Sequence, residues 1–179
     1  VVAFFVAEDK IQFATNKEQN FEVEFSQQSL DLFKPIFENE NILKIFYNKK
    51  AMLHLLDKNN IKQKNSVDVS LGAYLLNSNL QVSDASIAFD YLGIENSAFV
   101  CGLVEAWEYL EQHLKEEKMW DLYNTMELPL VDILFDMEKT GICVNKEILS
   151  ELRPIYVDEA KRLEKQIFNL AGCELNVSS

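Results

Sequence analysis

Polar and apolar residues alternate along much of the first 28 positions, which is the period of β-strands. Residues 1–7 are almost wholly apolar, so we expect a strand buried on both faces, inside a sheet rather than at its edge. A polar turn leads into a second alternating stretch over 11–15, and the two together predict a β-hairpin. A third strand is predicted over 21–25, where aromatic and β-branched residues recur at every second position.

The apolar period then changes to three and four residues, which indicates helices. Helices are predicted over 29–37, 51–57, 68–75, 83–92 and 98–114, with one further short strand over 42–47. Asp68 is placed to cap one of these helices, and Gly93 to end another. Mixing strands with helices in this way predicts an α/β fold.

The last third of the chain is helical throughout. One helix should run from about 127 to Gly141 and a second from Asn145, as its N-cap, to Gly172. The two predict an antiparallel helical hairpin. In the first helix Asp132, Asp136 and Glu138 lie opposite an apolar face of Leu130, Ile133, Leu134 and Met137, so we expect the acidic side to be solvated. The charge run at 115–118 divides the chain into predicted domains 1–118 and 119–179.

Composition narrows the classes of function. The 179 residues carry 29 acidic and 17 basic side chains, a net charge of −12, and affinity for nucleic acid comes mostly from Lys and Arg. The chain alone should therefore bind DNA weakly. Three separated cysteines show no CxxC or Cys/His pairing, which supports neither a zinc site nor a disulfide framework. No stretch is long enough to span a membrane, and a cytoplasmic protein is expected.

Several short motifs, in order along the whole chain, resemble the bacterial family A DNA polymerases, the DNA polymerase I family. In the front part they are residues 67–77 and 82–93. In the helix that begins near 127 and the turn after it, they are Pro129-Leu130, Leu134, Met137-Glu138, Gly141 and Val144. At the end of the chain they are Leu170-Ala171-Gly172 and residues 175–179. The resemblance implies a ribonuclease H-like 3′–5′ exonuclease-type domain, a mixed sheet with helices, followed by a helical hairpin from the polymerase thumb.

In that family the exonuclease holds two metal ions with four carboxylates, and a Tyr positions the attacking water. Hard divalent cations require such oxygen ligands. The first two carboxylates form an Asp-x-Glu on a strand before the hairpin, and we expect that first strand to be absent here. At the third position, four residues after Asn48, stands Met52. Ala98 and Gly102 stand at the Tyr and fourth carboxylate positions.

The resemblance therefore implies a vestigial exonuclease-like domain with no catalytic residues and no metal site. In the family, residues at the place of Asn176, Ser178 and Ser179 contact the primer–template backbone, and these three are the predicted DNA-binding residues. Plain capping of a following helix is an equal alternative, because Ser side chains cap helices well. The two histidines, His54 and His113, have no neighbouring ligands at metal spacing, so neither is expected to bind a metal.

The sequence is thus read as a catalytically silent piece of a DNA-directed DNA polymerase acting in replication and repair. We expect no cofactor in this piece and Mg²⁺ in the parent polymerase. The expected partners are primer–template DNA, through the parent, and the remaining palm, fingers and thumb. Two alternatives stay open: an active metal-dependent 3′–5′ proofreading exonuclease whose first strand is missing, and a non-catalytic protein-interaction module.

Overall fold

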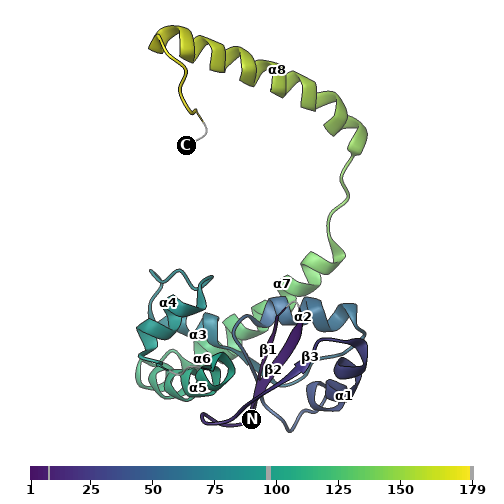
Figure 1. Cartoon of the computed structure of the whole chain (residues 1–179), viewed down its shortest axis with the longest axis vertical. Helices are drawn as coiled ribbons and strands as arrows, with labels where there is room; N and C mark the ends of the chain where they lie inside the picture. Colours follow the sequence, from purple (N-terminus) through teal and green to yellow (C-terminus); the bar gives the residue numbers. More distant parts are fainter. Residues whose placement is uncertain (8, 96–97, 178–179) are drawn as a thin grey trace. The chain divides into compact units, whose positions relative to one another are not determined.

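A computed structural model describes residues 1–7, 9–95 and 98–177, which form two compact units, Val1–Thr140 and Gly141–Ser179 (Figure 1). The first contains a sheet flanked by helices, and the second contains one long helix. The compact unit thus extends past the charge run at 115–118. The predicted family domains, 1–118 and 119–179, stay a prediction.

Five strands form one mixed sheet in the order β3-β2-β1-β4-β5. They are β1 (Val2–Val6), β2 (Lys10–Ala14), β3 (Asn20–Glu24), β4 (Lys44–Phe46) and β5 (Ser66–Asp68). Strands β1, β2 and β3 pair antiparallel, whereas β4 runs parallel to both β1 and β5. The predicted hairpin, third strand and mixed α/β sheet are confirmed.

Strand β1 confirms the expectation that residues 1–7 form a strand inside the sheet, whereas the expected absence of an earlier strand stays a prediction. Strand β1 is the central strand, hydrogen-bonded to β2 on one side and to β4 on the other. The physical signal was present in the sequence, because a strand that is apolar on both faces belongs at the centre of a covered sheet.

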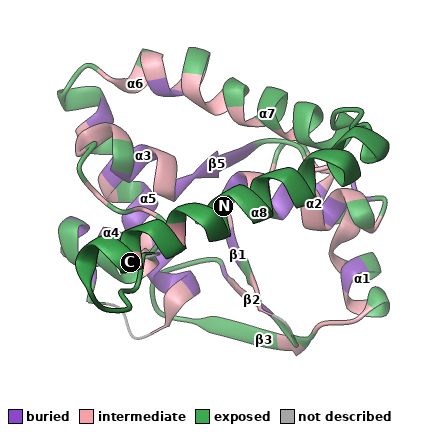
Figure 2. Ribbon diagram, turned by 90° about the horizontal axis from the view of Figure 1, so that it is seen from above, coloured by how far each residue is buried: buried purple, intermediate pink, exposed green. Residues whose placement is uncertain are grey.

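Helices cover both faces of the sheet. Helices α1 (Gln27–Phe37) and α2 (Lys49–Lys58) pack on one face, over a core that includes Phe4, Ile11 and Phe46. The other face carries Ala3 and Ile45 and is covered by α3 (Val69–Leu76), α4 (Ala85–Leu92) and α5 (Phe99–Glu116). Figure 2 shows the buried residues concentrated on these facing surfaces. Neighbouring strand residues thus serve two different cores, as the alternation of a strand requires.

The helix ends follow the predicted capping chemistry. The Asp68 side chain accepts a hydrogen bond from the Leu71 amide at the start of α3, and Gly93 ends α4 with a left-handed backbone, φ +70°. Asn145 caps α8 (Lys146–Ala171), which Gly172 ends at φ +72°. Each of these four predictions is confirmed.

The chain leaves α5 through α6 (Trp120–Leu122) and a π-helical turn, η1 (Tyr123–Glu127), and continues into α7 (Leu128–Thr140). Helix α7 lies against α2 with its charged side. Asp132 pairs with Lys49 at 2.7 Å, and Glu138 pairs with both Lys50 and His54. Both carboxylates stay exposed, so the acidic side is solvated as expected, although it also forms ion pairs with α2.

The apolar face of α7 also points to solvent. Leu130, Ile133, Leu134 and Met137 are between 39% and 62% exposed. The helix is amphipathic, as predicted. Its acidic side faces α2, because the lysines of α2 attract the carboxylates. The predicted helical hairpin would join α7 to α8. These helices belong to different compact units, so their pairing stays a prediction.

Candidate functional site

An apolar cavity opens where the parallel strands β1 and β4 end and α2 begins. Its volume is about 160 Å³, and its lining residues are Phe4, Phe5, Val6, Phe46, Tyr47, Asn48, Ala51, Met52 and Leu55. Parallel strands bring their carboxyl ends to one edge, where α/β proteins commonly place their ligands. No Asp or Glu is among the residues that line this cavity.

The residues predicted at the third carboxylate position lie in this wall. Asn48 is the N-cap of α2, and its Oδ1 accepts a hydrogen bond from the Ala51 amide at 3.0 Å. Met52 follows one turn later and is only 8% exposed, packed in the core with Phe4 and Leu56. Its thioether supplies apolar packing where a hard cation would need an oxygen.

The first turn of α5 approaches the same edge of the sheet. Phe99 places its ring 4.7 Å from that of Phe5, edge to face, and stacks on Phe89 at 5.2 Å. Phe89 in turn packs against Gly102, where an added Cβ would lie 2.7 Å from the Phe89 ring. A carboxylate at position 102 would therefore require Phe89 to move. Aromatic rings occupy the space beside Gly102.

The carboxyl end of β1 bears on the other two carboxylates. At the carboxyl end of this central strand stand Phe5 and Val6, both of which line the cavity. The Asp-x-Glu that the resemblance implies is not found on this strand. Across residues 1–7, 9–95 and 98–177, no group of three or more His, Cys, Asp or Glu is placed to hold a metal ion.

Asp68 is the one buried carboxylate in the described part of the chain. Its Oδ2 accepts a hydrogen bond from the Lys49 amide at 2.8 Å, and its Oδ1 accepts from Ser70 Oγ at 2.7 Å and from the Leu71 amide. Burial raises the pKa of Asp68, while these three donors oppose the rise. All of these bonds join β5 to the starts of α2 and α3. The Asp68 carboxylate therefore stabilises the fold.

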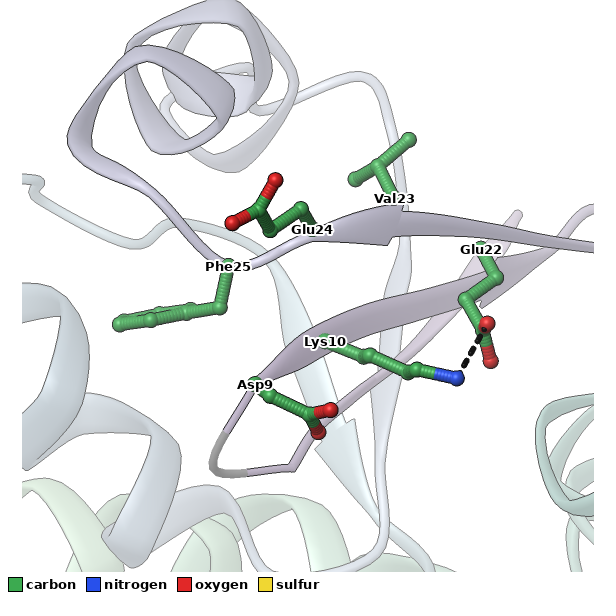
Figure 3. A pocket seen from close by; sticks show the side chains of 6 residues that line it. All are labelled: Asp9, Lys10, Glu22, Val23, Glu24 and Phe25. Atoms are coloured by element: carbon green, nitrogen blue, oxygen red, sulfur yellow. Dashed lines mark ion pairs between the residues drawn. The ribbon is translucent and has the colours of Figure 1, made fainter.

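A larger hollow of about 390 Å³ lies beside the turn that joins β1 to β2, next to the start of β2 and the end of β3 (Figure 3). Lys10 pairs with Glu22 across it at 2.7 Å, and the carboxylates of Asp9 and Glu24 point away from each other. The neighbouring Glu8 lies outside the described residues. The pairing lowers the pKa of Glu22, first through the hydrogen bond from Lys10. This is an exposed ion pair on a hairpin.

The histidines take part in local packing. His54 Nε2 lies 2.7 Å from Glu138 and its ring is 4.9 Å from Phe135. His113 Nδ1 bonds the Tyr109 carbonyl, one helical turn earlier, and stacks on the Tyr109 ring. Neither is grouped with other ligand side chains among the residues that the structure describes.

The three predicted DNA-binding residues follow α8. Asn176 is exposed, in the segment after Gly172. Ser178 and Ser179 lie outside the described residues. DNA contact by these side chains stays a prediction, as does their alternative role in capping a following helix.

Residues 5–98 match the family described as DNA polymerase I, ribonuclease H-like domain. This chain belongs to that family. The DNA polymerase I of Caldicellulosiruptor bescii is 29% identical over 187 residues, which cover 98% of this chain and 21% of that protein. The DNA polymerase I of Rhizobium leguminosarum is 25% identical and covers 86% of this chain and 18% of its own length.

A solved structure, the POL domain of Pol1 from M. smegmatis in complex with DNA primer-template and dNTP, superposes with a TM-score of 0.73. It covers 99% of this chain and 35% of that chain at 18% identity, which is a likeness of fold. The ribonuclease H-like assignment of the first unit is thus confirmed. The chain spans about a fifth of the length of the curated DNA polymerase I relatives named above. Among the described residues no helix has the length and apolar composition needed to cross a bilayer.

Proposed function

We propose that this chain is a non-catalytic part of a cytoplasmic DNA polymerase I that acts in DNA replication and repair. Residues 1–118 would be an exonuclease-like domain that lacks its catalytic carboxylates. Residues 119–179 would be the start of the thumb. The observation that carries the proposal is the apolar cavity at the carboxyl ends of β1 and β4, walled by Phe5 and Met52.

The physical reason is that the apolar wall of this cavity lacks the carboxylate ligands that phosphodiester hydrolysis requires. Two-metal hydrolysis needs carboxylates to hold the ions and stabilise both reacting oxygens. Phe5 and Phe99 fill the strand edge with hydrocarbon, and the Phe89 ring lies too close to Gly102 to admit a side chain there. Apolar packing at this edge supports the proposal that the groups required by the reaction have been replaced.

The direct test is an exonuclease assay on a 3′-labelled single strand, with Mg²⁺ or Mn²⁺ and an EDTA control. We expect no shortening of the strand by the chain. Calorimetric titration with Mn²⁺ should show no binding to the cavity variant Met52→Leu or to the unaltered chain. Metal-dependent shortening that EDTA abolishes would establish the alternative, an active proofreading exonuclease.

The polymerase part of the proposal needs the parent protein. We expect the parent to extend a primer in the presence of Mg²⁺, its proposed cofactor, and to bind primer–template DNA. Replacing Asn176, Ser178 and Ser179 together by Ala should weaken that binding, whereas Asn169→Ala on α8 serves as the matched control. A parent that fails to extend a primer, whatever the metal, would overturn the assignment.

A further inference from the structure

The apolar cavity at the carboxyl ends of β1 and β4 has the size of a small-molecule site. Its volume of about 160 Å³ is close to the roughly 150 Å³ of a dry apolar cavity that holds one benzene molecule. Every lining residue belongs to the first compact unit, Val1–Thr140, so the walls do not depend on the second unit. The volume therefore suits a ligand built on a single six-membered ring.

Aromatic side chains supply much of the wall. Phe4 and Phe46 are each 1% exposed, and Met52 of the same core is 8% exposed. Phe5 in β1 and Tyr47 directly after β4 add two further rings. Aromatic rings attract one another in edge-to-face and offset arrangements, beyond what their buried area contributes. Such a wall favours an aromatic ligand over an aliphatic one of equal size.

Contacts with other elements hold this wall in shape. The Tyr47 hydroxyl donates a hydrogen bond to the Val82 carbonyl at 2.7 Å. The ring centroid of Phe99 lies 6.0 Å from that of Tyr47 and 4.7 Å from that of Phe5. Because these rings are already positioned, a ligand does not have to order them, and less of its binding free energy is lost.

Asn48 supplies the cavity with one available hydrogen-bond donor. Its Oδ1 caps α2 by accepting from the Ala51 amide at 3.0 Å, and its Nδ2 has no hydrogen-bond partner among the described residues. An acceptor atom on a ligand can therefore bind this amide. None of the described residues that line the cavity carries a charge, so a phosphate group would find no cation in its wall.

We propose that this cavity binds an uncharged, single-ring aromatic molecule that carries one hydrogen-bond acceptor. The ring would lie among the aromatic side chains, and the acceptor would bind Asn48 Nδ2. The inference goes beyond the proposed function and does not depend on it, because it concerns binding rather than hydrolysis. For a ligand this small we expect a dissociation constant on the order of 0.1–1 mM.

Benzonitrile is the probe, because it joins one benzene ring to a nitrile that only accepts hydrogen bonds. The chain has four methionines, and their isotope-labelled methyl groups report the place of binding by NMR. We expect the Met52 methyl resonance to shift and saturate, because a ring bound beside it changes the local magnetic field. Those of Met126 and Met137, outside the cavity, should not move. A Met52 resonance that stays unchanged at about 10 mM benzonitrile, well above the expected dissociation constant, would overturn the proposal.

Ala51→Leu tests the position of the ligand by filling the cavity. Ala51 lines the cavity in the first turn of α2, and Leu, like Ala, is a good helix former, so circular dichroism should show an intact fold. The affinity for benzonitrile should fall more than about tenfold. Ala160→Leu makes the same change on α8 and should leave the affinity unaltered. Equal binding to Ala51→Leu and to the unaltered chain would overturn the assignment to this cavity.

Asn48→Asp tests the contact with the acceptor. Asp keeps the helix cap but replaces the Nδ2 donor with an oxygen. Benzonitrile should bind this variant about fivefold more weakly than it binds the unaltered chain. Toluene, which has no acceptor, should bind the two proteins within about twofold of each other. An equal loss for both ligands would show damage to the wall and contradict the role of Asn48.

Two further ligands test the chemical class. Cyclohexanecarbonitrile carries the same nitrile on a saturated ring and should bind at least about threefold more weakly than benzonitrile. Thymidine monophosphate adds a charged phosphate to a ring of similar size and should not shift the Met52 methyl resonance at the same concentration. Equal affinity for the saturated ring would overturn the aromatic assignment, and binding of the nucleotide would overturn the assignment of an uncharged ligand.

Discussion

The phenol oxygen of Tyr123 pairs with both backbone groups of Asp68. It accepts a hydrogen bond from the Asp68 amide at 2.8 Å and donates one to the Asp68 carbonyl at 3.0 Å. Tyr123 begins the π-helical turn η1 and is fully buried, and burial raises its pKa. One side chain thus replaces the partners that the end of β5 would otherwise obtain from a neighbouring strand.

Tyr123→Phe should destabilise the protein by about 2 kcal/mol, because it leaves a buried amide and a buried carbonyl without partners while keeping the ring. Urea unfolding followed by circular dichroism measures the change. Tyr91→Phe removes the hydroxyl of a tyrosine that is 42% exposed and should alter stability by less than about 0.5 kcal/mol. Equal effects of the two substitutions would contradict the role of the Tyr123 hydroxyl.

Gly102→Ala should also be destabilising, although alanine is the better helix former. The added methyl group would meet the Phe89 ring at 2.7 Å and Ile94 Cγ2 at 3.4 Å. Overpacking of this kind costs about 1–3 kcal/mol, more than the gain of up to about 1 kcal/mol in helix propensity.

Adding Phe89→Leu tests the cause of that loss. The double variant should be more stable than the sum of the single effects predicts, because the smaller side chain leaves room for the methyl group. Strict additivity would locate the cost of Gly102→Ala elsewhere in α5. The measurement is the free energy of unfolding of all four proteins in urea.

Much of the fold could be predicted from sequence, because local signals were consistent with it. The hairpin and the cap at Asp68 depend on short-range chemistry that the sequence displays directly. The position of β1 inside the sheet could also be predicted, from its two-sided apolar pattern. Its parallel pairing with β4 could not, because the order of strands in a sheet is a long-range property.

The candidate site likewise combines features that the sequence shows locally with contacts between residues far apart in the sequence. From side chains alone the sequence predicts Met52, Ala98 and Gly102 as departures from a metal site, and this assignment stays a prediction. The aromatic contact beside the cavity joins Phe5 and Phe99, which are 94 positions apart in the sequence and whose ring centroids lie 4.7 Å apart. Nothing local indicates that these two rings meet. The ion pairs between α7 and α2 likewise could not be predicted, because the amphipathic pattern does not show that lysines of another helix will approach the acidic side.

The ion pair between Lys49 and Asp132 should be a principal attachment of α7 to α2. The Lys49 side chain is only 6% exposed, and its Nζ lies 2.7 Å from Asp132. Asp132→Asn would leave a buried ammonium group without a charged partner, which we expect to cost about 1–3 kcal/mol. Asp136→Asn is the matched control, since Asp136 makes no ion pair among the described residues.

Hydrogen exchange separates local from global effects of that substitution. Amides of α7 should exchange faster in Asp132→Asn than in Asp136→Asn, while those of β1 change little, because α7 packs on the outside of the unit. If the α7 amides exchange equally in both variants, the ion pair does not hold the helix in place.

Lys44 should make stability rise with pH in the alkaline range. Its side chain is fully buried, Nζ donates to the Asn39 carbonyl at 2.7 Å, and burial lowers the pKa of Lys44 from 10.5 to about 8. Between these two values the unfolded chain holds a proton that the folded chain has released. The free energy of unfolding therefore increases with pH in that window, by up to about 3 kcal/mol.

Comparison with Lys44→Met isolates this contribution from other titrating groups. Urea unfolding of both proteins at several pH values from 7 to 10.5 should show the unaltered chain gaining stability relative to the variant as pH rises above about 8. Lys62→Met, at an exposed lysine, should follow the unaltered chain throughout. Parallel pH profiles for the unaltered chain and Lys44→Met would mean that the Lys44 ammonium is as well solvated in the folded protein as in the unfolded one.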